Sequence, residues 1–378
     1  MSTAKSNGTV LFAQLDRFSY TNDAMLEHLR PRMAQAGLTL EPVRVYRELI
    51  RNPLHVAMGL AAVARSHGPR ALFDRKLLNE RFIKTPFFFR LASRWLRRYA
   101  RRFPDLAVVF QTQCLFDARV GTTPLVLYTD NTMRNRINRS AAHVGGSDAM
   151  VALEGKVYRG ADAIGVSAGH VRQSLVEDYG VSPDRVSVTY IGANGPRPRP
   201  APVERYASRH ILFVGIDWER KGGPTLVKAF EIVANRIPDA RLTVVGCRPD
   251  VSHPRVTILG RVPPEQVATL MAEAAVFCMP SLVEPSSVAA LEAARAELPI
   301  VATHVGGFLD SVDHGTTGLL VAPGDAEALA DALIRLLEDP AECRRMGEAG
   351  AKWVARFDWN IVCDRLAELI VDAAGARA

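Results

Sequence analysis

The stretch AVFCMPSLVEPSSVAALEAARAELPIVATHVGG, residues 275–307, contains a complete strand–helix–strand unit. It opens with an apolar run of strand length, AVFCMPS, and closes with a second one, PIVAT, and an alanine-rich segment of helical character lies between them. Apolar strands that alternate with helices are typical of parallel sheets covered on both faces. The stretch therefore predicts a βαβ unit and an α/β fold.

The same alternation continues along all 378 residues and gives twelve candidate strands. They cover residues 9–15, 38–46, 106–112, 124–130, 163–168, 186–192, 210–215, 241–246, 255–260, 275–281, 299–303 and 318–322. Twelve strands are too many for one compact sheet, but they suit two doubly wound parallel-sheet domains of the Rossmann-like type. Ligands of such sheets bind beyond the carboxyl ends of the strands, so we expect the two domains to face a cleft.

A proline-rich run between the two groups of strands marks the domain boundary. We predict an N-terminal domain over residues 1–195, a stiff linker over 196–209 and a C-terminal domain over 210–355. The tail, residues 356–378, has the apolar spacing of a terminal amphipathic helix.

The formal net charge of +7 is concentrated in one segment, residues 70–102. This segment holds eleven Lys or Arg and two acids, which gives it a charge of +9 and leaves −2 for the remainder of the chain. Within it, residues 85–103 predict a helix with Thr85 as its N-cap and Pro86 in its first position. The aromatic and aliphatic side chains of this helix share one face, and its arginines crowd the other.

Two interpretations of this basic helix stay open. A cationic face behind an apolar face is typical of a helix that lies on an anionic membrane surface. The same pattern also fits a helix of the first domain whose apolar side packs on the sheet while its arginines stay in water. No recognition motif or platform of stacking aromatics accompanies the charge, so we expect no nucleic-acid partner.

The cysteine pattern and the hydropathy exclude several classes of protein. The five cysteines are scattered, without CxxC or Cys/His ligand spacing, so we expect reduced thiols and neither a zinc site nor a disulfide framework. No run approaches the ~20 apolar residues that span a bilayer. The start of the chain lacks the pattern of a secretory signal. We therefore expect a cytoplasmic protein, either free or peripheral on the inner face of a membrane.

The segment IDWERKGG, residues 216–223, follows a predicted strand that ends at Gly215. Arg220 and Lys221 stand directly before a glycine pair at a strand-to-helix turn. Two cations beside such a pair suit phosphate binding, because glycines let the backbone approach an anion. The spacing is not that of a Walker loop, and a solvated Arg-Lys pair on a loop is the alternative.

Two glutamates flank the start of the helix in the opening stretch. Glu284 precedes it, Ser286 or Ser287 can cap it, and Glu292 lies two turns inside it. A diphosphate would be held by the helix start and the two cations, whereas a carboxylate suits hydroxyl groups. Glu292 lies ~9 Å along the axis from Ser286, which would place the two carboxylates on a sugar and on a ribose. An exposed acid is the alternative for Glu292, although its apolar neighbours predict burial.

These motifs resemble the donor domain of the retaining GT-B glycosyltransferases of family GT4. FVGIDWERKGG, LTVVG, MPSLVEPSSVAALEAARAELPIVATHVGG and GTTGLLVAPGDAEALADAL occur in the family's order over roughly residues 210–360. The resemblance implies a GT-B architecture with the donor in the second domain and the acceptor in the first. It also implies that the terminal helix crosses back to the N-terminal domain.

The resemblance assigns roles to individual residues. Arg220 and Lys221 would hold the diphosphate, Glu292 the ribose, and Glu284 would face the transferred sugar. The donor site would be completed by Gly215, Ser286 and Ser287. Two departures stand out: Ile216 occupies a position where many members have Arg, and Ser286-Ser287 replaces the usual Phe-Gly.

The resemblance is weaker before residue 190. The first loop, residues 16–26, lacks the glycine pair that many members place near the donor phosphates. At the end of the strand over 124–130, Thr129 replaces the family's usual His, while Asp130 remains. Asp130 is sited to hydrogen-bond a sugar hydroxyl or to accept the acceptor proton, and a capping role in a turn is the alternative.

The sequence therefore predicts a retaining glycosyltransferase that moves a sugar from a nucleotide-diphosphate sugar to a hydroxyl of a glycan, glycolipid or small molecule. The family's front-face reaction implies that neither a metal ion nor a cofactor besides the donor is needed. A GT-B epimerase or hydrolase of nucleotide sugars is one alternative. A non-catalytic nucleotide-sugar-binding protein is another, suggested by the missing glycines and by Thr129.

Overall fold

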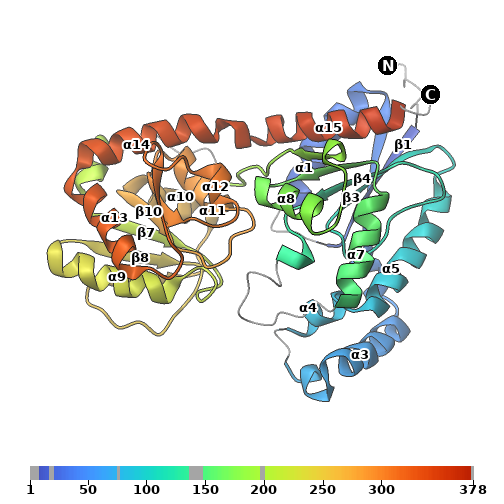
Figure 1. The fold of residues 1–378 in the computed structure, drawn as a ribbon, viewed down its shortest axis with the longest axis horizontal. Coiled ribbons are helices and arrows are strands. Elements are labelled where there is room, and N and C mark those ends of the chain that lie inside the picture. The colour runs from blue at the N-terminus through green and yellow to red at the C-terminus, as the bar shows by residue number, and fades with distance from the viewer. Residues whose placement is uncertain (1–7, 17–20, 75–76, 136–147, 196–200, 376–378) are drawn as a thin grey trace. The chain divides into compact units, whose positions relative to one another are not determined.

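The computed structural model describes residues 8–16, 21–74, 77–135, 148–195 and 201–375. The chain divides into two compact units, Met1–Tyr190 together with Trp359–Ala378, and Ile191–Asp358 (Figure 1). Each unit contains one six-stranded sheet in which neighbouring strands run parallel. All twelve predicted strands are present. The predicted α/β class with two doubly wound parallel sheets is confirmed.

The first sheet has the strand order β2-β1-β3-β4-β5-β6. The chain leaves β1 toward one edge and later returns to β3 on the other side, so the switch point of the sheet lies between β1 and β3. The strands are β1 (Gly8–Gln14), β2 (Leu38–Arg44), β3 (Leu106–Thr112), β4 (Leu125–Thr129), β5 (Ala163–Val166) and β6 (Val186–Val188). The helices are α1 (Thr21–Gln35), α2 (Val45–Ile50), α3 (Pro53–His67), α4 (Leu78–Ile83), α5 (Pro86–Tyr99), α7 (Asp148–Gly160), α8 (Gly169–Glu177) and α15 (Trp359–Gly375), with 3-10 turns η1 (Pro69–Leu72), η2 (Ala100–Arg102) and η3 (Pro183–Arg185).

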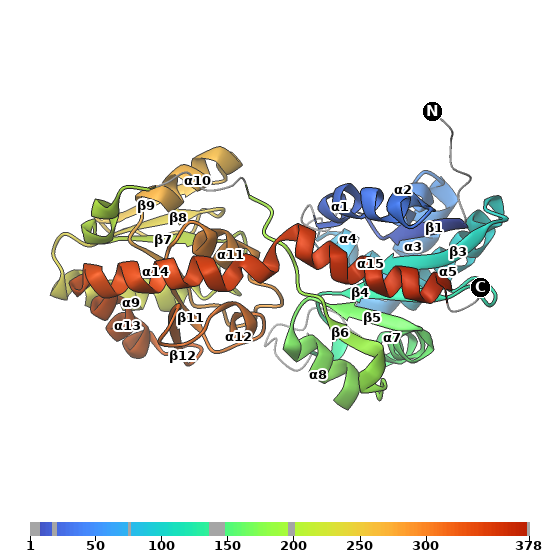
Figure 2. The same ribbon diagram turned by 90° about the horizontal axis from the view of Figure 1, so that it is seen from above.

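Helix α15 belongs to the first unit although it comes last in the chain. It packs beside α1 and across β3, β4 and β5 (Figure 2). Its side chains at Val362, Leu366 and Ile370 are fully buried. Their spacing of four residues places them on one face of the helix. The end of the chain therefore completes the core of the domain that its beginning forms.

The basic helix predicted over residues 85–103 is α5. The hydroxyl of Thr85 accepts a hydrogen bond of 3.1 Å from the N–H of Phe88, which confirms the predicted cap. Phe88 and Leu96 on its apolar face are fully buried in the core, and its arginines are exposed. No helix in the described ranges is both long and apolar enough to cross a membrane. The apolar face of α5 packs on the protein, which corrects the expectation that this face could lie on a membrane.

The second sheet has the strand order β12-β11-β10-β7-β8-β9, and its switch point lies between β7 and β10. The strands are β7 (His210–Val214), β8 (Arg241–Val245), β9 (Val256–Gly260), β10 (Val276–Met279), β11 (Ile300–Thr303) and β12 (Gly318–Val321). The helices are α9 (Gly223–Arg236), α10 (Pro264–Glu273), α11 (Val288–Arg295), α12 (Phe308–Ser311), α13 (Ala326–Glu338) and α14 (Pro340–Trp353), with 3-10 turns η4 (Val203–Ala207) and η5 (Val354–Phe357).

Part of the predicted linker packs on the second unit. Residues 196–200 lie outside the described residues, and the remainder contains the 3-10 turn η4. In this turn Arg205 is 4% exposed and donates hydrogen bonds to the carbonyl oxygens of Ala296 (2.7 Å) and Met271 (3.3 Å). A buried guanidinium requires such acceptors. These bonds hold the segment before β7 against the second unit.

Candidate functional site

Two polar loops of the second unit meet at the switch point of its sheet. One covers residues 215–222 after β7, and the other covers residues 280–287 after β10. Because β7 and β10 are parallel neighbours, their carboxyl ends open at the same edge of the sheet. Gly222 has a φ of +74°, and a Cβ there would overlap the carbonyl oxygen of Pro280. The glycine thus permits a close approach between the two loops.

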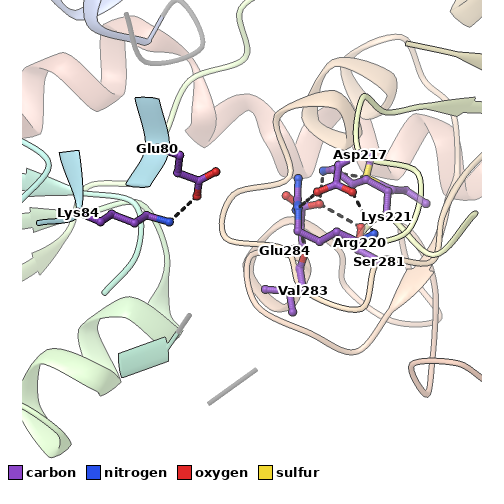
Figure 3. A network of polar contacts seen from close by, with 9 residues as sticks. Glu80, Lys84, Asp217, Arg220, Lys221, Ser281, Val283 and Glu284 are labelled. Atoms are coloured by element: carbon purple, nitrogen blue, oxygen red, sulfur yellow. Dashed lines mark hydrogen bonds and ion pairs between the residues drawn. The ribbon is translucent and has the colours of Figure 1, made fainter. Parts of the chain in front are cut away.

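Lys221 and Glu284, one from each loop, form an ion pair between Nζ and Oε2 (Figure 3). Their side chains are 13% and 3% exposed. The hydroxyl of Ser281 donates a hydrogen bond of 3.1 Å to the same carboxylate oxygen, and Sδ of Met279 lies 3.4 Å from Nζ. A buried carboxylate needs such compensation. The structure therefore brings two of the predicted site residues into direct contact.

A third loop, after β11, supports the main chain of Glu284. The N–H of Gly307 donates a hydrogen bond of 2.8 Å to the carbonyl oxygen of Glu284. Gly306 has a φ of +51°, and a Cβ there would overlap the same oxygen. The glycine pair that ends the opening stretch thus lets this loop lie directly against Glu284.

Arg220 joins the two loops by a second route. Its Nε donates to the carboxylate of Asp217 at 3.2 Å, and its Nη1 donates to the carbonyl oxygen of Val283 at 2.9 Å (Figure 3). Its side chain is 38% exposed, in contrast to that of Lys221. A guanidinium has five N–H donors, so Arg220 keeps donors for an anion. Its predicted role on a diphosphate stays a prediction.

Gly215 lies at the end of β7 and makes room for the stem of Lys221. Its N–H donates a hydrogen bond of 2.9 Å to the carbonyl oxygen of Val245. A Cβ on Gly215 would lie 2.8 Å from the ring of Phe213 and 3.2 Å from Cγ of Lys221. Any larger residue would therefore push on the lysine that reaches Glu284.

Ser286 and Ser287, the two serines that we named as possible caps, lie directly before α11. Ser287 occupies the N-cap position, but its hydroxyl makes no capping bond and is instead 2.7 Å from the hydroxyl of Ser311. The side chain of Ser287 is therefore not the cap, because its hydroxyl is bonded to Ser311 on α12. Ser286 is partly exposed, and its carbonyl oxygen accepts a hydrogen bond of 2.8 Å from Val288.

Glu292 lies inside α11, and its side chain is mostly withdrawn from solvent. Its carboxylate accepts hydrogen bonds from the backbone N–H groups of Asn194 and Gly195. Burial raises the pKa of Glu292, and these two bonds and the charge of Arg295 act in the opposite direction. A carboxylate offers about four acceptor positions, so Glu292 can still receive hydroxyl groups. Its contact with residues 194–195 was not predicted.

The first unit has a cavity of about 110 Å³ beside the switch point of its own sheet. The ends of β1, β3 and β4 reach it through Leu15, Gln113 and Thr129. Asp130 also lines this cavity and is 8% exposed. The loop after β1, where the glycine pair is missing, is described only as far as Asp16, and residues 17–20 lie outside the described residues. The predicted acceptor-side residue thus lies in a cavity of the first unit.

Sequence reasoning missed three charged residues of this cavity. Lys84, whose side chain is 5% exposed, forms an ion pair with Glu80 (Figure 3). Glu154 accepts hydrogen bonds from the hydroxyls of Tyr158, at 3.0 Å, and Tyr179. Burial and the adjacent carboxylate raise the pKa of both tyrosines, so both stay protonated donors.

Local signals for these residues exist in the sequence. Glu80 and Lys84 are four residues apart, the spacing of ion pairs on a helix surface. Glu154 lies four residues after Met150 and four before Tyr158, so it stands on the apolar face of its helix. An acid on such a face requires a partner.

The described part of the chain contains no group of three or more His, Cys, Asp or Glu side chains that could hold a metal ion. The expectation that the protein needs no metal or further cofactor stays a prediction. The charged groups of the two loops include the cations Arg220 and Lys221 and the carboxylates Asp217, Glu219 and Glu284.

A family model of known proteins matches the second unit of the chain. The family model described as Glycosyl transferases group 1 matches residues 208–339. This range includes both polar loops and the helix that carries Glu292. The region predicted from the sequence to form a donor domain is therefore the region that the family model matches.

Two solved structures share the fold over almost the whole chain. Sucrose-phosphate synthase from Thermosynechococcus elongatus has a TM-score of 0.70 at 19% identity and covers 97% of this chain and 100% of its own. Anabaena Alr3699/HepE, solved in complex with UDP-glucose, has a TM-score of 0.65 at 15% identity. The match covers 96% of this chain and 99% of the Anabaena chain. These likenesses support the GT-B architecture.

Curated relatives are more similar in sequence. A D-inositol 3-phosphate glycosyltransferase of Corynebacterium aurimucosum is 30% identical over 66% of this chain and 66% of its own length. A second relative, from Mycobacterium tuberculosis, is a GDP-mannose-dependent alpha-(1-6)-phosphatidylinositol monomannoside mannosyltransferase. It is 29% identical over 59% of this chain and 65% of its own length. The chain spans 61–66% of the length of the first relatives it matches. Residues 208–339 of the second unit thus match the family Glycosyl transferases group 1, as the GT4-like motifs of this region indicated.

Proposed function

We propose that the protein is a retaining glycosyltransferase that moves a sugar from a nucleotide-diphosphate sugar to an acceptor hydroxyl. The observation that carries this proposal is the buried Lys221–Glu284 pair at the switch point of the second sheet. Lys221 can bind the diphosphate of a nucleotide-diphosphate sugar, and the adjacent Glu284 can accept hydrogen bonds from the hydroxyls of its sugar. The match of this unit to the family model supports the same assignment.

In the proposed reaction, the bond between the sugar C1 and the diphosphate oxygen breaks. A bond between C1 and the acceptor oxygen forms on the same face of the sugar, and the acceptor proton passes to the departing diphosphate. Lys221 and Arg220 stabilise the negative charge that develops on the diphosphate. Glu284 accepts hydrogen bonds from the sugar and holds Lys221 in position. The proposal requires no metal ion for this step.

Replacement of Glu292 by alanine tests the nucleotide site. We expect binding of the matching nucleotide to weaken by roughly 1–3 kcal/mol, because the ribose hydroxyls lose a charged acceptor. The measurement is calorimetric titration of the wild type and the variant with UDP, GDP, ADP and dTDP. Glu231→Ala, an exposed glutamate on α9, is the matched control and should bind like the wild type. Equal affinity of the wild type and Glu292→Ala would remove the ribose role.

The cavity of the first unit is the proposed acceptor site. Its lining combines carboxylates at Asp130 and Glu154, the Lys84 ammonium and the Gln113 amide. Groups of this kind hydrogen-bond several hydroxyls at once, which suits a polyol. The relatives are named for inositol 3-phosphate and for a phosphatidylinositol mannoside. These names support our proposal that the acceptor of this chain is polyhydroxylated, on a small molecule, a glycan or a lipid.

Asp130→Asn is expected to lower the rate of transfer by about 10²-fold, because an ionised carboxylate orients the acceptor hydroxyl better than a neutral amide does. Nucleotide binding should be unchanged, since Asp130 lies in the other unit. The assay follows nucleotide release from UDP-glucose or GDP-mannose with D-inositol 3-phosphate present. Asp184→Asn, an exposed aspartate of the same unit, serves as the control. A parallel fall in nucleotide affinity would contradict the acceptor role.

The same assay separates this proposal from its alternatives. A hydrolase would release nucleotide at the same rate with and without an acceptor. An epimerase would change the donor sugar without release of nucleotide. A binding protein would bind nucleotide in the calorimeter and leave the donor intact, whereas the proposed transferase releases nucleotide faster when an acceptor is added.

A further inference from the structure

Helix α3 of the first unit presents an apolar face to solvent. Leu54 is 69% exposed, Met58 is 54% exposed and Leu60 is 37% exposed. Only Gly59 and Val63 of this helix are buried. Ala57 and Ala61 on the outward side are exposed as well. An ordinary surface helix carries polar groups on the side that faces away from the core, so this face calls for a partner.

The sequence of α3 explains why this side points outward. A Cβ on Gly59 would overlap the ring of Phe82 on α4, so α3 must turn its smallest side chain inward there. Val63, one turn further along, is fully buried beside it. The inward face is thus fixed by the packing against α4, and Leu54 and Met58 are left on the opposite face, with Leu60 at its flank.

Exposed apolar side chains continue beyond α3. Phe73, directly after the 3-10 turn η1, is 84% exposed, and Leu77 is 38% exposed. Seven of the thirteen exposed large hydrophobic residues in the described chain lie between residues 50 and 77. We call Leu54, Met58, Leu60 and Phe73 the apolar surface. Such a concentration marks an interaction site, because single exposed apolar residues are normally scattered.

Positive charge surrounds the apolar surface. Arg65 and Arg70 lie on the same segment, and α3 contacts α5 (Figure 1), whose arginines are exposed. In the part of the chain that the structure describes, none of these arginines has an ion-pair partner; they are Arg65, Arg70, Arg90, Arg94, Arg97, Arg98 and Arg101. The nearby acids Asp74 and Glu80 are paired with Arg81 and Lys84. The surroundings of the apolar surface are therefore strongly cationic.

We propose that the apolar surface docks the first unit on an anionic lipid bilayer, with the free arginines facing the head groups. An amphipathic helix with arginines beside its apolar residues lies in the interface of such a bilayer. Charge complementarity selects this occupant over a second copy of the chain, since two copies would bring the same uncompensated arginines together. Helix α5 contributes attraction through its arginines, and α3 and Phe73 contribute the inserted side chains.

Flotation with lipid vesicles tests this proposal on the full chain. The probes are vesicles of phosphatidylcholine alone and equimolar vesicles of phosphatidylcholine and phosphatidylglycerol. We expect binding to the anionic vesicles, and a loss of about tenfold or more in partitioning for the double variant Leu54→Ser/Met58→Ser. Arg94→Gln and Arg97→Gln should each reduce it by roughly fivefold. Ile232→Ser, a 39% exposed isoleucine on α9 of the second unit, is the matched control.

Each outcome decides the proposal. All the substituted side chains are exposed, so thermal midpoints should stay equal to that of the wild type, and this is measured in parallel. Binding of the wild type to neither kind of vesicle, or full binding of the double variant, would overturn the assignment. A concentration-dependent dimer that disappears in the double variant, without vesicle binding, would identify a second copy as the occupant instead. Nucleotide binding by the same samples shows that the second unit is intact.

Discussion

Replacement of Lys221 by methionine is expected to lower the rate of sugar transfer by about 10²–10³-fold and the free energy of unfolding of the second unit by about 3–5 kcal/mol. Both effects have the same origin. Glu284 is 3% exposed, and Lys221 is the cation that compensates it. Without Lys221, the side-chain partner that the carboxylate keeps among the described residues is Ser281, and the diphosphate loses a cation as its charge develops. Denaturant unfolding and the nucleotide-release assay measure the two effects separately.

The double variant Lys221→Met/Glu284→Gln is the control that separates stability from function. It removes both charges, so no uncompensated carboxylate remains, and most of the lost stability should return. Transfer should stay as low as in the single variant, because neither the cation nor the charged acceptor is present. If the double variant were as unstable as Lys221→Met, the ion pair would not be the source of the stability loss. If the single variant transferred sugar normally, Lys221 would have no role on the diphosphate.

Acidification from pH 6.5 to pH 4 is expected to remove about 3 kcal/mol of stability through one residue, His210. His210 begins β7, is 3% exposed, and its Nε2 lies 2.8 Å from the hydroxyl of Thr243. Burial, together with the charge of Arg241, lowers the pKa of His210 from 6.5 to about 4, and a hydrogen bond to the backbone of Glu273 opposes this. The unfolded chain therefore takes up a proton below pH 6.5 while the folded chain stays neutral. Folding loses stability over this window and levels off below pH 4.

The variant His210→Gln isolates this contribution. The glutamine amide can keep a hydrogen bond to Thr243 but does not titrate in this range. Unfolding free energies of the wild type and the variant are measured at several pH values between 7 and 4. The wild type should lose about 3 kcal/mol more than the variant, since the effects of the carboxylates are common to both and cancel in the difference. Parallel curves would show that His210 is not the group responsible.

Local patterns in the sequence correctly predicted the strands, the start of α5 and the positions of the two polar loops. Apolar runs such as 106–112 and 241–246 carry their strand signal in a few consecutive residues, and each became a strand of a parallel sheet. Thr85 and Pro86 marked the start of α5, because caps depend on neighbouring residues only. The two polar loops of the second unit were also found locally, as charged segments between an apolar strand and a helix.

Other features depend on residues far apart in the chain. The ion pair of Lys221 and Glu284 joins positions 63 residues apart, and its existence follows from the order of β7 and β10 in the sheet. The hydroxyl of Ser287 forms a hydrogen bond with that of Ser311 and does not cap its own helix, because α12 brings Ser311 close to the start of α11. The backbone of Asn194 and Gly195 reached Glu292 in the same way. No spacing within one segment could have shown these partners.

The sequence by itself determined the α/β class, the strands, the basic segment and the residues of the two polar loops, because periodicity and turn chemistry act over a few residues. The tertiary structure alone decided which side chains are buried, paired or exposed. An apolar face is compatible with a core and with a partner, so burial of the α5 face and exposure of the α3 face became known only from their packing. The acids of the first-unit cavity likewise come from separate elements, Glu80 from α4, Asp130 from the end of β4 and Glu154 from α7, and only the tertiary structure brings them together.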